Sequence, residues 1–383
     1  METTPRTVRQ TLSQLRDLPP VSVERRAATL EKFWQQAPLG PPPETGVFPW
    51  AQVRRGIAAL AESAPRCLEP ERLEKPGVLA LILAGNTPLL AWPVLHYAVL
   101  LGIPVFIKQS RDEVVWTRHF VETLAQIDPE VAALLHLDLF PGAMDERMMS
   151  LIVEANATIA YGSAQTIQAL WGYAYWRPFL PFGHATSIGY LGDGSGWQDG
   201  DKFAYDVLMY GQQGCLSPHI IYVHGGEHSS ILWGKELACA LATVAEALNM
   251  PPVTDLAIAK RVREVADIAR FTAGDTVIQD SALRWTVIYS TQPAILTPGI
   301  GHGVVRVIPA HYRFFRHWPH LMGSMRGKIS SVGVAGELSE EQRGALQAEG
   351  VSRICPAGEM QTPPLDWRNG NVDVRAWLIK ALG

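Results

Sequence analysis

Aliphatic runs that alternate with helical patterning constrain the fold of this chain more than any other feature. The run from Val78 to Leu83 is wholly aliphatic, which is typical of a parallel strand buried on both faces. Two further runs, Pro104 to Ile107 and Thr158 to Tyr161, are also followed by segments with helical periodicity. This alternation predicts a doubly wound α/β sheet, which binds its ligands at the carboxyl ends of the strands.

The stretch from Leu89 to Ile107 is apolar and nearly long enough to cross a membrane. Pro93 and the break from Gly102 to Pro104 divide it, and residues of this kind interrupt a helix. We therefore expect a buried helix that begins near Pro88, then a turn and a strand, and no membrane span.

The composition is that of a folded protein with two domains. The chain has 383 residues, of which 47% are hydrophobic and 18% charged, and this balance argues against disorder. A net charge of -4 without a long basic run argues against a nucleic-acid partner. The four cysteines lie far apart without a metal-binding pattern, and the polar N-terminus is not typical of a secretory signal. We therefore expect free thiols, no metal site and a cytoplasmic location.

Outside these strands, the pattern predicts helices and connectors. Helical periodicity covers Val23 to Gln35 and Trp50 to Ser63, and the prolines between them predict a stiff connector from Leu39 to Pro43. The polar, glycine-rich stretch from Gly192 to Lys202 predicts a surface loop.

One cysteine occupies a tight connection between two apolar runs. Val207 to Tyr210 is a strand-like run that leads into the connection, and Ile220 to Val223 predicts the strand that follows. Glycines and a proline between these runs prevent regular secondary structure, so Cys215 lies on a turn whose backbone N–H groups have no partner in a helix or sheet. A thiolate beside such donors is a nucleophile with part of an oxyanion hole. A cysteine that packs as a small hydrophobic residue fits the same pattern, so both interpretations stay open.

The segment QQGCLSP, Gln212 to Pro218, and the strand after it resemble the catalytic loop of the aldehyde dehydrogenase superfamily. The resemblance is strongest to its acyl-CoA reductases, of which the fatty acid reductase of bacterial bioluminescence is the type member. It extends from about Val78 to Gly370 and includes a Pro-x-Gly-x-Met at Pro356 to Met360. The resemblance implies an aldehyde dehydrogenase-like fold, with a Rossmann-like cofactor domain and an α/β catalytic domain.

From this resemblance we expect an NADP(H)-binding domain over residues 1–186 and a catalytic domain over residues 187–355. Residues 356–383 would form a C-terminal segment that packs on the first domain or on a partner subunit. Members of the superfamily usually form homo-oligomers through strand exchange, and Val372 to Trp377 is the expected exchange strand.

The cofactor site is also implied by the resemblance, because no G-x-G-x-x-G fingerprint follows any strand. In the superfamily, a lysine after one strand and a Gly-Ser helix start after another hold the dinucleotide. Here these positions are Lys108, with Ser110 and Arg111 just beyond it, and Gly162 and Ser163. A guanidinium pairs well with a phosphate, so Arg111 favours NADPH. Without the resemblance, Lys108 would be a solvated strand end and Ser163 a helix N-cap.

Two more residues are candidates for catalysis. The resemblance gives Asn86, in LAGNTPL, the role of donating to the oxyanion. Aldehyde-oxidising members carry a water-activating glutamate before the cysteine, but the matching segment, Pro181 to Thr186, has no carboxylate. An acyl-cysteine would then exchange with a thiol, which suits a reductase of acyl-CoA or of an acyl carrier protein. A Gly-His pair is usual at this place in the reductases, so His184 is the candidate acid or base.

One departure leaves alternatives open. The glutamate that holds the nicotinamide ribose in oxidising members would fall near Thr297 to Gly301, where no acidic residue occurs. A non-catalytic aldehyde dehydrogenase-like partner protein is therefore one alternative. Reduction of an acyl phosphate, which occurs in the same superfamily, is another.

Overall fold

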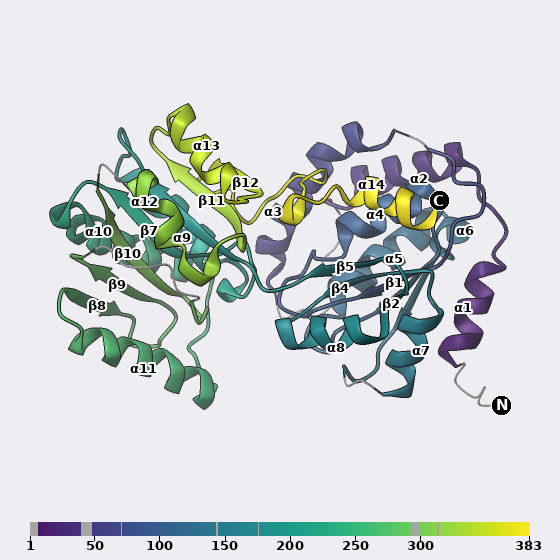
Figure 1. Cartoon of the computed structure of the whole chain (residues 1–383), viewed down its shortest axis with the longest axis horizontal. Coiled ribbons are helices and arrows are strands. Elements are labelled where there is room, and N and C mark those ends of the chain that lie inside the picture. Colours follow the sequence, from purple (N-terminus) through teal and green to yellow (C-terminus); the bar gives the residue numbers. More distant parts are fainter. Residues whose placement is uncertain are drawn as a thin grey trace. The chain divides into compact units, whose positions relative to one another are not determined.

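The computed structural model describes residues 7–39, 48–69, 71–142, 145–174, 176–292, 299–311 and 314–383. The chain forms two compact units (Figure 1). The first contains Met1–His184, Pro364–Trp367 and Val372–Gly383, and the second contains Ala185–Pro363 and Arg368–Asn371. In the sequence, the long stretch of the first unit ends at His184, and residues 356–383 are shared between the two units. Most of the expected connector, residues 40–43, lies outside the described residues.

A parallel sheet of five strands forms the centre of the first unit. Its strand order is β3-β2-β1-β4-β5, and every described pairing is parallel. This sheet confirms the predicted doubly wound fold. The strands are β1 (Leu79–Ile82), β2 (Val105–Lys108), β3 (Leu135–Asp138), β4 (Ala157–Tyr161) and β5 (Phe179–Phe182).

Helices cover both faces of this sheet. Figure 1 shows α7 and α8 on one face and α4 and α14 on the other. Helix α1 packs against α7, and α2 packs against α4 and α5. The helices are α1 (Val8–Arg16), α2 (Val23–Gln36), α3 (Trp50–Ser63), α4 (Trp92–Leu101), α5 (Val115–Ile127), α6 (Pro129–Ala132), α7 (Glu146–Glu154), α8 (Ala164–Ala174) and α14 (Val374–Leu382).

Helix α4 begins later than the sequence predicted. Residues 88–91 form a turn, and Pro93, not Pro88, occupies the first turn of the helix, where its missing N–H costs nothing. The helix ends at Gly102, whose left-handed φ of 73° suits a residue without a Cβ atom. Within the described residues, no helix combines the length and apolar character that crossing a bilayer requires.

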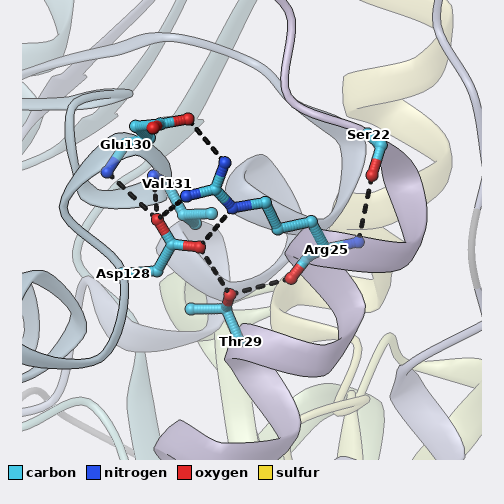
Figure 2. Close-up of polar contacts among 6 residues, drawn as sticks. All are labelled: Ser22, Arg25, Thr29, Asp128, Glu130 and Val131. Carbon is cyan, nitrogen blue, oxygen red and sulfur yellow. Dashed lines mark hydrogen bonds and ion pairs between the residues drawn. The ribbon is translucent and has the colours of Figure 1, made fainter.

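A network of charged hydrogen bonds holds α2 against the junction of α5 and α6 (Figure 2). Arg25 donates to both carboxylate oxygens of Asp128, at 2.6 and 2.9 Å, and to Glu130 at 2.5 Å. The same carboxylate caps α6 by accepting from the N–H groups of Glu130 and Val131. The hydrogen bond from Arg25 lowers the pKa of Asp128, so this carboxylate stays charged at neutral pH.

A sheet of seven strands forms the centre of the second unit. Its order is β12-β11-β6-β7-β10-β9-β8, and only the pairing of β8 with β9 is antiparallel among those described. The strands are β6 (Thr186–Leu191), β7 (Pro218–His224), β8 (Asp275–Gln279), β9 (Thr286–Ser290), β10 (Val304–Ala310), β11 (Ile329–Ala335) and β12 (Arg353–Pro356).

Two apolar clusters attach helices to this sheet. Residues of α9 and α10 share a cluster with β7, β9 and β10, and residues of α12 and α13 share another with β6, β7 and β11. The helices are α9 (Gln198–Leu208), α10 (Glu227–Ala247), α11 (Leu256–Phe271), α12 (Phe314–Leu321) and α13 (Glu340–Ala348).

The structure corrects the sequence prediction before the cysteine. Part of the predicted loop from Gly192 to Lys202 is helical, because α9 begins at Gln198. The run from Val207 to Tyr210 is not a strand but the end of α9 and the start of the 3₁₀ turn η2 (Met209–Gln212). Phe203, Ala204 and Val207 recur at helical spacing and are all buried, which explains why a helix forms.

The predicted exchange strand from Val372 to Trp377 is wrong. This segment begins the helix α14, which Asp373 caps by accepting from the N–H of Ala376 at 2.9 Å. Leu378 and Leu382 recur one turn apart and are buried, and α14 packs against α4 of the same unit. These residues therefore offer no strand for exchange, and a homo-oligomer stays a prediction.

Candidate active site

The candidate cofactor residues share one edge of the five-stranded sheet. Strand β1 pairs with β2 on one side and with β4 on the other, and Ile82 lies opposite both Lys108 and Ala160. The loops that carry Asn86, Lys108 and Gly162 therefore leave the sheet side by side at its carboxyl edge. The strand order reverses between β1 and β4, and such a switch point is the usual ligand site of a doubly wound sheet.

Close backbone packing joins the first two of these loops. A Cβ atom at Gly85 would lie 2.5 Å from Oγ of Ser110 and 2.7 Å from Cβ of Asp112. Only glycine allows this approach, so the Gly85–Asn86 turn contacts the segment that carries Ser110 and Arg111. Ser110 and Arg111 are therefore held beside the turn of Asn86.

Lys108 presents a cation at this edge. Its side chain is largely buried, and Nζ lies 5.7 Å from the centre of the Phe140 ring. Burial lowers the pKa of Lys108, and the positive charge of Arg111 lowers it further, whereas Asp145 raises it. Lys108 forms no salt bridge with any residue that the structure describes. Two neighbouring cations, neither of which forms an ion pair with a residue in the described ranges, favour an anionic ligand here.

The turn at Gly162 and Ser163 begins α8 at the same edge. Ser163 accepts a hydrogen bond from the N–H of Thr166 at 3.1 Å, so its side chain acts as an N-cap. A Cβ atom at Gly162 would lie 3.0 Å from Cγ2 of Thr166, which explains the glycine. The first N–H groups of α8 and the cations of the β2 loop together suit the phosphates of a dinucleotide.

His184 ends the long N-terminal stretch of the first unit and lies two residues after the end of β5. Its side chain is exposed, and within the described parts of the chain no hydrogen bond fixes its ring. The structure therefore places His184 at the carboxyl end of a strand but shows no partner that would tune it for acid or base chemistry.

Cys215 lies in the second unit, just before β7, at the amino edge of the seven-stranded sheet. Its side chain is half-buried, whereas Cys67 and Cys355 are buried and Cys239 is exposed. The residue is therefore partly accessible, although burial around its sulfur raises the pKa of the thiol.

An unusual backbone conformation precedes the cysteine. Tyr210, Gly211 and Gln212 have φ values of 54°, 62° and 59°, three consecutive residues in the left-handed region. For a residue other than glycine this conformation costs about 1 kcal/mol or more. The amide of Gln212 offsets the cost, because it is buried and donates to the carbonyls of Pro218 at 2.9 Å and Val304 at 3.0 Å. These bonds hold the two ends of the cysteine loop together.

A buried carboxylate provides a second brace. Asp206 is inaccessible to solvent and accepts from the N–H groups of Gly358, at 2.6 Å, and Met360, at 3.0 Å. The side chain of Gln361 donates to the carbonyl of Asp206 and to Oγ of Ser217, two residues after the cysteine. Asp206 therefore ties the Pro-x-Gly-x-Met segment to the cysteine loop.

Neither brace was predicted from the sequence. One feature of the sequence could have pointed to the role of Asp206, since a carboxylate directly before an apolar run is a candidate for a buried, hydrogen-bonded charge. No feature of the sequence pointed to the role of Gln212, because a left-handed conformation of a residue other than glycine cannot be predicted from one sequence. The segment near Thr297 to Gly301, where a ribose-holding glutamate was sought, is described only from Gly299 onward.

Comparison with known proteins identifies the family. A family model described as acyl-CoA reductase (LuxC) matches residues 59–367. The chain belongs to the LuxC acyl-CoA reductase family. A search of curated proteins found no match. As a LuxC-family member, the chain is an oxidoreductase that acts on acyl groups, and the resemblance noted from QQGCLSP is confirmed.

Solved structures show that the LuxC-family chain has an aldehyde dehydrogenase-like fold. An oxidoreductase from Marinobacter aquaeolei is 15% identical with a TM-score of 0.71, over 98% of this chain and 88% of that one. A putative methylmalonate-semialdehyde dehydrogenase from Sinorhizobium meliloti 1021, complexed with NAD, is 13% identical with a TM-score of 0.68, over 98% and 87%. The glyceraldehyde-3-phosphate dehydrogenase GapN from Methanocaldococcus jannaschii DSM 2661, complexed with NADP, is 12% identical with a TM-score of 0.70, over 98% and 91%.

Proposed function

We propose that this chain reduces an acyl thioester, acyl-CoA or an acyl carrier protein, to an aldehyde with NADPH, through an acyl-enzyme on Cys215. The observation that carries the proposal is the cysteine loop. The cysteine residue is only partly buried, and a left-handed backbone and two buried braces hold the loop in place. A cysteine that only fills the core needs no such support, whereas a nucleophile gains from being held in one position.

In the first half of the reaction, Sγ of Cys215 attacks the thioester carbonyl. The new C–S bond forms as the C–O π electrons move to oxygen, and the tetrahedral intermediate then collapses with loss of the carrier thiolate. We assign Asn86 the role of donating to the oxyanion, for which one donor typically contributes a factor of about 100 to 1000 in rate. His184 is proposed as the acid that protonates the leaving thiolate, because an imidazole can both take up and donate a proton.

The second half of the reaction reduces the acyl-cysteine. NADPH, when bound, supplies the hydride that converts the acyl group to the aldehyde. The segment from Pro181 to Thr186 contains no carboxylate that could activate water, so the acyl-cysteine persists until it is reduced.

The residues proposed to hold the cofactor are those at the carboxyl edge of the five-stranded sheet. Lys108, Gly162 and Ser163 would hold the phosphates, with Ser110 beside them. Arg111 is exposed, lies in the electrostatic field of Lys108 and is free to pair with a 2′-phosphate, which supports NADPH over NADH.

Replacing Arg111 by alanine should lower the preference for NADPH over NADH by about 10- to 100-fold, which corresponds to one bidentate pair with a phosphate. The measurement is the ratio of kcat/KM for the two cofactors. Arg118, an exposed arginine on α5, provides the control, and Arg118→Ala should leave the ratio unchanged. An unchanged ratio in the Arg111 variant would remove the basis for assigning it to the 2′-phosphate.

The proposed function is tested by the products. Incubation with a series of acyl-CoA substrates of graded chain length and NADPH should consume NADPH and release CoA and aldehyde in equal amounts. Free acid should not accumulate, because the chain offers no carboxylate at the water-activating position. The result would exclude a thioesterase and identify the preferred chain length.

A non-catalytic partner protein would behave differently. It would release no CoA from any acyl-CoA and would show no saturable binding of NADPH in a fluorescence titration. A reductase of acyl phosphates would consume NADPH with an acyl phosphate but not with any thioester. Either outcome would refute the proposal.

A further inference from the structure

A buried hydroxyl close to Cys215 has no assigned role. Ser330, in β11, is only 2% exposed, and its Oγ makes no hydrogen bond of normal geometry with the described residues. Buried polar groups are nearly always hydrogen-bonded, because leaving one unpaired costs about 1–3 kcal/mol. A hydroxyl kept in such a place calls for an explanation.

An irregularity in the sheet sets the position of this hydroxyl. Ile329 of β11 lies opposite Thr186 of β6, and Val332 lies opposite Ile188. The two residues between them on β11 therefore face the single residue Ser187 on β6, which is a β-bulge. Bulges are common beside active sites, where they redirect a side chain.

A chain of hydrogen bonds links the bulge to the cysteine. The hydroxyl of Ser187 accepts from the N–H of Ser331 at 3.0 Å and donates to the carbonyl of Cys215 at 2.6 Å. The carbonyl of Ser330 accepts from Oγ of Ser352 at 2.6 Å, which holds the other side of the bulge. The backbone of Cys215 is thus held against the bulge that carries Ser330.

The group that Ser330 can act on is the sulfur of Cys215. Burial raises the pKa of Cys215, whereas the hydroxyl of Ser330 and the N–H of Cys215 itself lower it. No charged side chain in the described part of the chain shifts this pKa. Two histidines lie near this loop. His219 is on β7, four residues after Cys215, and His302 contacts the side chain of Gln213. Neither of them acts on the Cys215 thiol.

We propose that Ser330 donates a hydrogen bond to the thiolate of Cys215 and stabilises it both as the nucleophile and as the leaving group. The proposal rests on the proposed function, because it assumes that Cys215 is the nucleophile. A neutral thiol is a weak acceptor and leaves the hydroxyl unpaired, whereas a thiolate is a strong one. The hydrogen bond therefore forms when the sulfur becomes charged.

The same bond serves the last step of the reaction. After the acyl group has been reduced, the tetrahedral thiohemiacetal collapses: the C–O bond becomes a carbonyl, the C–S bond breaks, and its electron pair returns to sulfur. The thiolate that forms again accepts from Ser330. One hydroxyl thus raises the fraction of reactive thiolate before attack and stabilises the departing sulfur on release. Its loss should slow each step by about threefold, because a more basic thiolate is also the stronger nucleophile.

The test is the pH dependence of alkylation of Cys215 by iodoacetamide, followed by mass spectrometry of the tryptic peptide that contains it. Ser330→Ala should raise the midpoint of this profile by about one pH unit, because it removes a hydrogen bond to a charged group. Ser330→Thr keeps a hydroxyl and should restore the midpoint to near that of the parent protein. An unchanged midpoint in Ser330→Ala would overturn the proposal.

Two controls separate this effect from a structural one. Ser331→Ala removes an adjacent hydroxyl that is equally buried but does not act on the Cys215 thiol, and it should leave the midpoint unchanged. Ser330→Ala should not lower the thermal unfolding temperature, because its hydroxyl has no hydrogen-bond partner among the described residues. A lowered temperature with an unchanged midpoint would assign Ser330 to structure and refute the proposal. Alkylation requires no acyl-CoA, so this outcome is independent of whether the chain reduces thioesters.

Discussion

Cys215→Ala should form no acyl-enzyme and should lose aldehyde formation by at least about a thousandfold, because it removes the only proposed nucleophile. Preincubation with radiolabelled acyl-CoA in the absence of NADPH should label the parent protein at one site. The label should appear on the peptide that contains Cys215 and should be missing from the variant. NADPH binding should persist, since the residues proposed to hold the cofactor belong to the other unit.

The matched control for this prediction is Cys239→Ala. Cys239 lies on α10 of the same unit and is the most exposed of the four cysteines, so it is the thiol with the best access to an acyl donor without any catalytic assistance. Its replacement should leave both labelling and activity near those of the parent. Equal labelling of the Cys215 variant and the parent would place the acyl group elsewhere and end the proposed mechanism.

The second large effect concerns stability. Asp206→Ala should lower the free energy of unfolding by about 3–5 kcal/mol, because two buried backbone N–H groups lose a charged acceptor at once. Asp206→Asn should recover only part of this loss, since an amide offers one acceptor oxygen and would direct its NH₂ group toward a donor. Urea unfolding followed by circular dichroism measures both variants.

Asp201 provides the comparison for this prediction. It is a carboxylate on the same helix, α9, but its side chain is exposed, so Asp201→Ala should change the unfolding free energy by only about 0.5 kcal/mol. If Asp206→Ala proved as stable as Asp201→Ala, the carboxylate would not be the brace that holds the segment from Gly358 to Gln361.

Much of the fold could be predicted because its central strands are aliphatic. Strands β1, β2 and β4 lie in the middle of the parallel sheet with both faces covered, and their sequences show this directly. Strands β3 and β5 were missed, because LHLD and FLPF carry polar residues or a proline. Both lie at the edges of the sheet, where such residues are tolerated.

The candidate site was predictable only in its residue types. The cysteine, the asparagine and the lysine were assigned because their local sequences resemble those of a known family, and their roles stay predictions. The conformation of the cysteine loop could not, since only Gly211 among its three left-handed residues signals a positive φ. Gln212 adopts it because its side chain donates to groups far away in the sequence, such as the carbonyl of Val304. Ser330 was invisible for the same reason, as a bulge depends on the pairing of two strands that are far apart in sequence.

Helix α14 has a consequence for how the protein is made. It packs against α4, and the carbonyl of Leu382 accepts from the N–H of Gly77 at 3.1 Å, so segments far apart in the sequence complete the first unit. On the ribosome, the segment that forms the second unit emerges before α14, and domains generally fold as units during synthesis. The second unit can thus reach its native state while the apolar surface of α4 that packs against α14 is still exposed to solvent. A nascent chain in that interval is the form that most needs a chaperone.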